Sequence, residues 1–191
     1  MITTICQILF LGSPLLLVAV AQGICLKYAL LSRLKLPLDF GKTFHGKRIF
    51  GDHKTFRGFF INTAFCIIGA MIQAGMQIAG LIPPWLPLLD YVTGWPLLGP
   101  LLGIGMTAGE LPNSFLKRQL EISPGKKGKG LWGLGFFLLD QVDLTIGIWV
   151  FIFLLVQPSP GLVAWSFILT ILLHIIVSSV GFLLGMRKTI V

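Results

Sequence analysis

Charged residues are scarce in this chain of 191 residues. Asp, Glu, Lys and Arg together make up 12% of it, whereas hydrophobic residues make up 55%. A water-soluble domain carries about 25% charged residues. With half that fraction, the chain cannot surround one hydrophobic core with a water-facing surface, which excludes a soluble globular domain. The mean hydropathy of +0.89 agrees, and we predict a membrane protein.

Cysteine is also rare, and the first apolar segment does not follow the pattern of a signal peptide. Cys6, Cys25 and Cys66 lie in apolar stretches without CxxC or Cys–His spacing. This excludes a disulfide framework or a zinc site, and the three are predicted to be small buried hydrophobic residues. No basic residue precedes the uncharged segment 1–26, which is too long for the apolar part of a signal peptide. We expect this segment to be retained as a transmembrane helix.

What the sequence does contain is a series of long apolar segments. A bilayer core of about 30 Å needs roughly 20 apolar residues per helix. The stretch 144–186 has no charged residue, but Pro158-Ser159-Pro160-Gly161 divides it into two spans. We therefore predict an all-α integral membrane protein, a single catalytic domain over 1–191, with five transmembrane helices at about 3–30, 58–81, 96–116, 131–156 and 162–186.

Basic residues lie at one side of these predicted helices. The loops at about 31–57 and 117–130 are rich in Lys and Arg, and Arg187 and Lys188 lie near the C-terminus, whereas the N-terminus and the other two loops have neither. By the positive-inside rule, both basic loops and the C-terminus are cytoplasmic and the N-terminus is outside. An odd number of helices agrees with this. The net charge of +8 suits anionic lipid surfaces, nucleotides or nucleic acid equally well.

Two carboxylates lie inside a predicted helix. Asp140 and Asp143 are spaced i, i+3, so they share one helix face, two to three turns beyond the cytoplasmic start. A bare carboxylate at that depth costs several kcal/mol unless it is paired, protonated or bound to a cation. A divalent cation relieves both this cost and the mutual repulsion, and hard carboxylate oxygens favour Mg²⁺. The alternative is a proton-relay or structural polar pair.

The preceding helix carries a polar stripe. Glu110, Asn113, Ser114 and Lys117 are spaced i, i+3, i+4 and i+7 and descend toward the cytoplasmic end. Glu110 lies near the predicted depth of Asp140 and is expected to complete a three-carboxylate cluster. The alternative is that Glu110 neutralises Lys117 or Arg118. The glycines of this helix favour close helix packing and are predicted to be structural; they are Gly99, Gly103, Gly105 and Gly109.

Two loops combine glycines with cations. Segment 39–58 interleaves glycines and aromatic residues with Lys42, Lys47, Arg48, Lys54 and Arg57, which suits a polyphosphate or lipid headgroup; the alternative is a topology loop on anionic lipid. Its GxxxxGK pattern is not a Walker A loop, because Arg48 stands where Ser or Thr is required. Segment 123–130 is also predicted to bind phosphate, with a solvated basic turn as the alternative; its cations are Lys126, Lys127 and Lys129. His174, in the last predicted helix, is interpreted as an interior polar group.

A family resemblance joins these motifs. Ser114-Phe-Leu-Lys117-Arg118, then Pro124-Gly125, then Leu139-Asp140-Gln-Val-Asp143, resembles the signature of the CDP-diacylglycerol synthase superfamily. The short chain and the segment Gly51-Asp-His-Lys-Thr-Phe-Arg-Gly58 are most similar to its archaeal branch. Two features depart from the pattern: Lys-rich sequence replaces HGG, and Gln141 replaces an Arg between the carboxylates.

The resemblance implies a CTP-dependent nucleotidyltransferase of archaeal ether-lipid synthesis. CMP would be transferred to 2,3-di-O-geranylgeranylglyceryl phosphate, giving CDP-archaeol and pyrophosphate. Asp140, Asp143 and Glu110 would bind Mg²⁺, with Lys117 also catalytic. Substrates would be bound by the remaining polar residues, namely Asn113, Ser114, Arg118 and the cations of the two loops. The expected partners are CTP, a lipid phosphate and membrane lipids, without nucleic acid.

Other functions are less well supported by the residues. The DGxxAR…GxxxDxxxD signature of CDP-alcohol phosphatidyltransferases is absent. A small cation or proton transporter using the three carboxylates stays an alternative, although basic loops on the carboxylate side favour phosphate chemistry. We expect a multi-pass protein of the cytoplasmic membrane whose active site faces the cytoplasm. The oligomeric state is left open.

Overall fold

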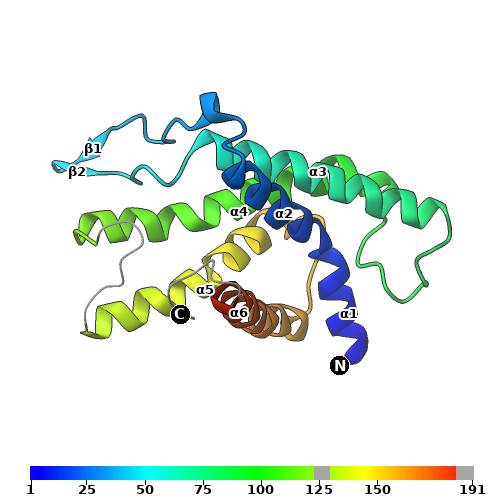
Figure 1. The fold of residues 1–191 in the computed structure, drawn as a ribbon. Coiled ribbons are helices and arrows are strands. Elements are labelled where there is room, and N and C mark those ends of the chain that lie inside the picture. Colours follow the sequence, from blue (N-terminus) through cyan, green and yellow to red (C-terminus); the bar gives the residue numbers. More distant parts are fainter. Residues whose placement is uncertain (123–129, 184–191) are drawn as a thin grey trace.

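A computed structural model describes residues 1–122 and 130–183, which are largely helical (Figure 1). The helices are α1 (Ile2–Leu11), α2 (Ser13–Lys27), α3 (Phe56–Ile78), α4 (Tyr91–Gln119), α5 (Gly130–Ile152) and α6 (Pro160–Leu183). A 3₁₀ turn, η1 (Ser32–Leu34), and an antiparallel hairpin of β1 (Thr43–Phe44) and β2 (Lys47–Arg48) lie between α2 and α3. Each of the five predicted segments coincides with helix, and the predicted mainly helical class is confirmed.

The number of membrane crossings stays a prediction. By length and apolar composition, α3 is the helix within the described residues that could cross a bilayer, and α1 with α2 would make a second if taken as one bent segment.

The helix predicted from residue 96 begins earlier, at Tyr91, because the Asp90 carboxylate caps it by accepting from the backbone N–H of Val92 at 3.1 Å.

The predicted helix at 3–30 is not continuous. It breaks at Gly12, where α1 and α2 meet with a bend of 44°, and helical structure ends at Lys27. Pro14 lies in the first turn of α2, where its missing N–H is tolerated. Gln73 of α3 donates to the carbonyl of Phe10 and to Oγ of Ser13, which supplies hydrogen bonds at the break. The prediction of one uninterrupted helix is therefore wrong.

The helix packing depends on glycine. α4 packs between α3 and α5, and α2 packs on α3. A Cβ at Gly103 would lie 2.3 Å from Cα of Thr63 in α3, and one at Gly109 would lie 2.3 Å from the carbonyl oxygen of Asp143 in α5. A Cβ at Gly99 would lie 2.5 Å from Cα of Ile67 in α3, and one at Gly105 would lie 2.9 Å from the carbonyl oxygen of Gly147 in α5. The prediction of close helix packing at these glycines is confirmed.

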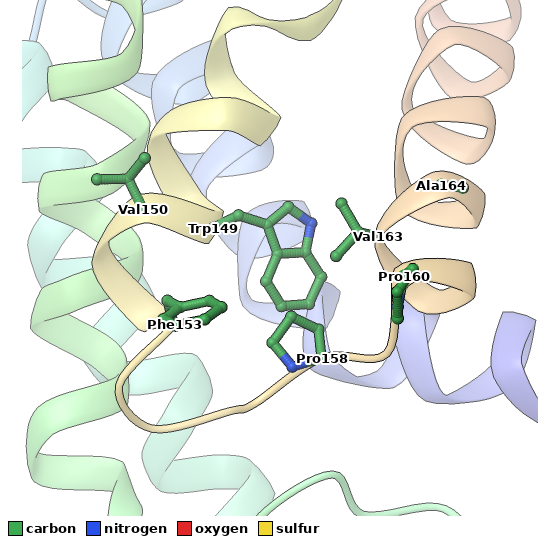
Figure 2. Close-up of a pocket in the computed structure, with 7 residues that line it drawn as sticks. All are labelled: Trp149, Val150, Phe153, Pro158, Pro160, Val163 and Ala164. Atoms are coloured by element: carbon green, nitrogen blue, oxygen red, sulfur yellow. The ribbon is translucent and has the colours of Figure 1, made fainter.

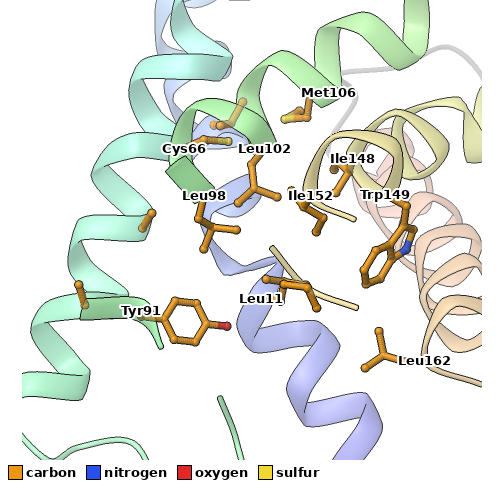
Figure 3. Close-up of a cluster of buried hydrophobic side chains, with 14 residues drawn as sticks. Leu11, Cys66, Tyr91, Leu98, Leu102, Met106, Ile148, Trp149, Ile152 and Leu162 are labelled. Atoms are coloured by element: carbon orange, nitrogen blue, oxygen red, sulfur yellow. The ribbon is translucent and has the colours of Figure 1, made fainter. Parts of the chain in front are cut away.

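The hydrophobic core lies where α3, α4 and α5 meet α1 and α6, with Val18 of α2 also buried in it (Figure 3). Tyr91, Leu98, Leu102 and Ile152 are almost fully buried in it. Cys66 is also buried there, and Cys25 is buried in a second, smaller cluster. All three cysteines are free thiols; the predicted burial is confirmed for Cys25 and Cys66, whereas Cys6 is only half-buried.

The β1–β2 hairpin lies at the same end of the molecule as the C-terminal end of α4 and the beginning of α5. In Figure 1 the β1–β2 hairpin, the C-terminal end of α4 and the beginning of α5 lie at the left of the view, and the N-terminus lies away from them. Among the described residues, the hairpin and the ends of α4 and α5 that border the predicted cytoplasmic loops are thus neighbours. Which side of the membrane they face stays a prediction.

Candidate active site

Four polar side chains meet where α4 and α5 face each other. Nδ2 of Asn113 donates to Oδ1 of Asp140 and, at 2.8 Å, to Oδ2 of Asp143. Nζ of Lys117 donates to both carboxylate oxygens of Asp140, with 2.6 Å to Oδ2. The structure therefore brings together four residues that the sequence had placed on two separate helix stripes.

Two members of this group, Asn113 and Asp143, are buried. Asn113 is 3% exposed and Asp143 is 8% exposed. Oδ1 of Asp143 also accepts from the backbone N–H of Leu144 at 2.7 Å. Oδ1 of Asn113 is buried and has no hydrogen-bond partner among the residues that the structure describes. A buried polar atom without a partner costs about 1–3 kcal/mol, so this amide oxygen is suited to a ligand beside the two carboxylates.

The donor set fits Mg²⁺. Two carboxylates and an amide oxygen are hard ligands, and Mg²⁺ commonly takes only one or two protein carboxylates, leaving positions for phosphate. Within residues 1–122 and 130–183, no three His, Cys, Asp or Glu side chains are close enough to hold one ion. The assignment of Asp140 and Asp143 as ligands stays a prediction, and so does Glu110 as a third.

Glu110 has a partner that the sequence did not indicate. Nζ of Lys54, just before α3, donates to Oε2 of Glu110 in a half-buried ion pair. The alternative that Glu110 neutralises Lys117 or Arg118 is wrong, because Lys117 pairs with Asp140 instead. Lys54 is thus the residue of the first basic loop that reaches the polar stripe of α4.

Asp39 organises that loop, a role the sequence did not reveal. Its side chain is fully buried and accepts from the backbone N–H groups of Gly41, Phe50 and Gly51 at 2.9–3.0 Å, and from the guanidinium of Arg48 at 2.8 Å. Burial alone raises the pKa of a carboxyl, but these hydrogen bonds outweigh it and hold the pKa of Asp39 well below its usual range. The loop therefore folds around one buried anion.

The organised loop packs on the C-terminal end of α4. Nζ of Lys47 donates to the carbonyl of Gln119 at 2.7 Å and pairs with Glu121 at 3.1 Å. Nε2 of Gln119 donates back to the carbonyl of Arg48 at 3.3 Å. Lys47 and Arg48 thus hold the loop in place, and their predicted contact with substrate stays a prediction.

The other predicted substrate-binding residues are spread more widely. Arg118 lies against Gly51, where an added Cβ would be 3.4 Å from its Cδ, and its Nε is buried without a partner in the described parts of the chain. Ser114 is half-buried and Lys42 is exposed. Arg57 donates to the carbonyl of Leu30 at 3.4 Å. Three further cations lie outside the described residues, namely Lys126, Lys127 and Lys129.

A separate cavity of about 680 Å³ lies at the connection of α5 and α6 (Figure 2). Its lining has no titratable side chain and consists of Trp149, Val150, Phe153, Pro158, Pro160, Val163 and Ala164. Phe153 lies 10 residues beyond Asp143 in the same segment of chain, so this apolar cavity is distinct from the polar group at the α4–α5 junction.

Comparison with known proteins gives a consistent result. A family model described as CarS-like, CDP-archaeol synthase, matches residues 5–190. A CDP-archaeol synthase of Methanoculleus marisnigri is 34% identical over 164 residues, covering 80% of this chain and 87% of that one. One of Methanospirillum hungatei is 36% identical over 171 residues, covering 84% and 93%.

A solved structure shares the fold. It is described as an intramembrane enzyme for archaeal membrane lipids biosynthesis, and it superimposes with a TM-score of 0.62. The two chains are 22% identical, over 88% of this chain and 90% of the other. The overall arrangement of helices is therefore one that an intramembrane enzyme also has.

Proposed function

Because this chain belongs to the CarS-like, CDP-archaeol synthase family, we propose that it transfers CMP from CTP to the phosphate of an unsaturated archaeal ether lipid. The acceptor is 2,3-di-O-geranylgeranylglyceryl phosphate, and the products are CDP-archaeol and pyrophosphate. The enzyme lies in the cytoplasmic membrane, with five helices crossing it and the α4–α5 junction facing the cytoplasm.

The observation that carries this proposal is the polar group of Asn113, Lys117, Asp140 and Asp143. Nucleotidyl transfer needs anionic oxygens for a divalent cation and positive charge for the phosphates, within one site. The junction holds both, and the basic loop organised by Asp39 packs beside it on α4. A lipid phosphate in the bilayer can meet this group while its tails stay among lipids.

The reaction requires no protein nucleophile. An oxygen of the lipid phosphate attacks the α-phosphorus of CTP in line, the new P–O bond forms, and the bond to the β-phosphate breaks to release pyrophosphate. Asp140 and Asp143, with Glu110 as the proposed third ligand, would hold Mg²⁺, which would neutralise charge on the phosphates when bound. Lys117 stabilises the negative charge that develops on the leaving pyrophosphate.

The remaining residues of the site have supporting roles. The Asn113 amide fixes the orientation of both carboxylates. Arg118 and Lys54 add positive charge from the α4 end and from the first basic loop, and Ser114 contributes a hydroxyl. Lys42, Lys47, Arg48 and Arg57, with Lys126, Lys127 and Lys129, supply the basic surface that attracts CTP and the lipid phosphate.

The decisive experiment follows two labels of CTP. Purified protein in detergent is incubated with Mg²⁺, the lipid phosphate and CTP labelled at either the α- or the γ-phosphorus. The α-label should enter the organic phase with the lipid, and the γ-label should stay in water as pyrophosphate. Lipid carrying the γ-label would indicate a kinase, and lipid without either label would refute transfer.

Two variants sharpen this test. Asp143→Asn removes a buried carboxylate of the site and should abolish the α-labelled lipid. Glu121→Gln removes a carboxylate at the same end of the molecule, but this side chain is 76% exposed and pairs with Lys47. Equal loss of transfer in both variants would argue against a specific role for Asp143.

A further inference from the structure

The site contains two ion pairs between lysine and carboxylate. In the proposed reaction each lysine would bind phosphate and each carboxylate would bind the cation, so both pairs would have to separate. Lys117 pairs with Asp140, and Lys54 pairs with Glu110. The side chains of the two lysines are 17% and 25% exposed, and those of the carboxylates are 43% and 33% exposed. Each pair is thus partly shielded from water, which strengthens it relative to the more open pair of Lys47 and Glu121.

These pairs set up a competition. In nucleotidyl transfer the carboxylates face a divalent cation and the lysines face phosphate oxygens. Lys117 already donates to both oxygens of Asp140, so a cation on that carboxylate competes with Lys117. Equally, a phosphate that takes Lys117 competes with Asp140. Separating a shielded pair leaves an uncompensated charge, which is strongly unfavourable.

The third carboxylate is placed differently. Asp143 accepts from the Asn113 amide and from a backbone N–H, and it has no lysine or arginine partner among the described residues. Asn113 also donates to Asp140. Asp140 therefore keeps one neutral hydrogen-bond partner when Lys117 leaves it. The hydrogen bond between Asn113 and Asp143 can therefore stay in place, and keep α4 and α5 aligned at the site, while the charged pairs rearrange.

We infer that Lys117 and Asp140, and in the same way Lys54 and Glu110, exchange partners when substrate binds. The carboxylates pass from lysine to the divalent cation, and the lysines pass from carboxylate to the nucleotide phosphates. No bond is made or broken, and every charge keeps a partner when cation and nucleotide arrive together. The site therefore discriminates against a free cation and against a cation-free nucleotide. This inference rests on the proposed function.

The first test measures cation affinity without nucleotide. Mn²⁺ serves as the probe, because free Mn²⁺ is quantified by paramagnetic resonance. Lys117→Met releases Asp140 and should bind Mn²⁺ at least about tenfold more tightly than the unaltered protein, equivalent to about 1.4 kcal/mol. The control is Lys27→Met, which removes an exposed lysine at the end of α2 that contacts the ring of Tyr28; it should change affinity by less than about twofold.

If Lys117→Met does not fold, Lys117→Gln removes the charge and keeps a hydrogen-bond donor, with the same result expected. Mn²⁺ affinity that rises no more in the Lys117 variants than in Lys27→Met would overturn the inference. Unaltered affinity would mean that Asp140 and its lysine do not compete with a cation.

The reciprocal test measures binding of CTP in the presence of a chelator. Asp140→Asn releases Lys117 and should bind cation-free CTP more tightly than the unaltered protein, again by about tenfold. Asp90→Asn serves as the control, because it also removes a carboxylate, but one that caps the start of α4 and bonds to Gln77, Val92 and Thr93 rather than to a lysine; its affinity for CTP should not change. Equal or weaker binding by Asp140→Asn would contradict the exchange.

These outcomes separate the inference from the proposed function. Transfer of α-labelled CMP by the unaltered protein, together with unchanged Mn²⁺ affinity in Lys117→Met, leaves the function standing and removes the exchange. Tighter Mn²⁺ binding in Lys117→Met without any CMP transfer by the unaltered protein supports the competition and removes the function.

Discussion

Replacing Asp39 with Asn should open the first basic loop. The Asp39 carboxylate accepts hydrogen bonds at both oxygens, and its Oδ2 serves the backbone N–H groups of Phe50 and Gly51. Asparagine has only one amide oxygen. The donors at the other position, either Gly41 and Arg48 or Phe50 and Gly51, would face an NH₂ group and lose their acceptor. The charge that pairs with Arg48 is also lost. A buried donor that loses its acceptor costs about 1–3 kcal/mol, and we expect this cost to appear in the opening of the loop.

Limited digestion with trypsin measures this opening, because the loop contains Lys42, Lys47, Arg48 and Lys54. When opening is fast relative to cleavage, the rate follows the population of open loop, so a cost of about 2 kcal/mol predicts roughly 30-fold faster cleavage. The matched control is Asp52→Asn, which also loses a bond to Arg48, but from a side chain that is 76% exposed; cleavage should rise by no more than about fivefold.

The pH dependence of the loop follows from the same carboxylate. Because the folded pKa of Asp39 is depressed, its stabilisation is fully present above the unfolded pKa of about 3.9 and is lost as the pH falls through the folded value. Hydrogen exchange of the loop amides should therefore differ most between the two chains near neutral pH and converge in acid. Cleavage of Asp39→Asn no faster than that of Asp52→Asn would refute the reasoning.

Three further predictions concern packing, topology and the site. Gly103→Ala places a methyl group 2.3 Å from the α3 backbone and should lower thermal stability in detergent by about 1–3 kcal/mol or more; Gly75→Ala, with open space around it, should not destabilise. Cysteines introduced at Thr43 and Ser159, on a cysteine-free background, should react from opposite sides of the membrane, and labelling from one side would overturn the five-helix topology. Asp143→Asn should abolish CMP transfer while the protein still inserts and purifies; retained Mg²⁺-dependent transfer would remove Asp143 from the site.

The sequence predicted much of the fold because the relevant signals are local. Long apolar segments locate the helices, and the i, i+3 and i, i+4 spacings place Asn113, Lys117, Asp140 and Asp143 on stripes that the structure brings into contact. The glycines of α4 mark close helix approach in the same way. The resemblance to the CDP-diacylglycerol synthase superfamily, in its archaeal branch, is confirmed by the family match.

What the sequence did not predict depends on contacts between distant parts of the chain. The break at Gly12 is signalled locally by Ser13-Pro14, but the α3 residue that supports it, Gln73, lies about 60 residues away. Asp39 looks like any polar loop residue until Phe50 and Gly51 are folded back onto it. The ion pair between Glu110 and Lys54 was not predicted for the same reason, because it depends on the path of the loop that carries Lys54.

The contact between Gly109 and Gly147 has a consequence for how the site responds to its surroundings. At this crossing the backbones of α4 and α5 touch directly, one turn from Asn113 and one turn from Asp143. Glycine has no side chain, so this contact between backbones cannot change through a change of rotamer. The distance between the two helices at the crossing is therefore independent of side-chain motion. Changes in bilayer thickness or lateral pressure, which tilt helices and alter how their outer faces contact lipid, would be absorbed away from this crossing. The separation between the α4 and α5 polar groups should therefore stay constant as the composition of the membrane changes.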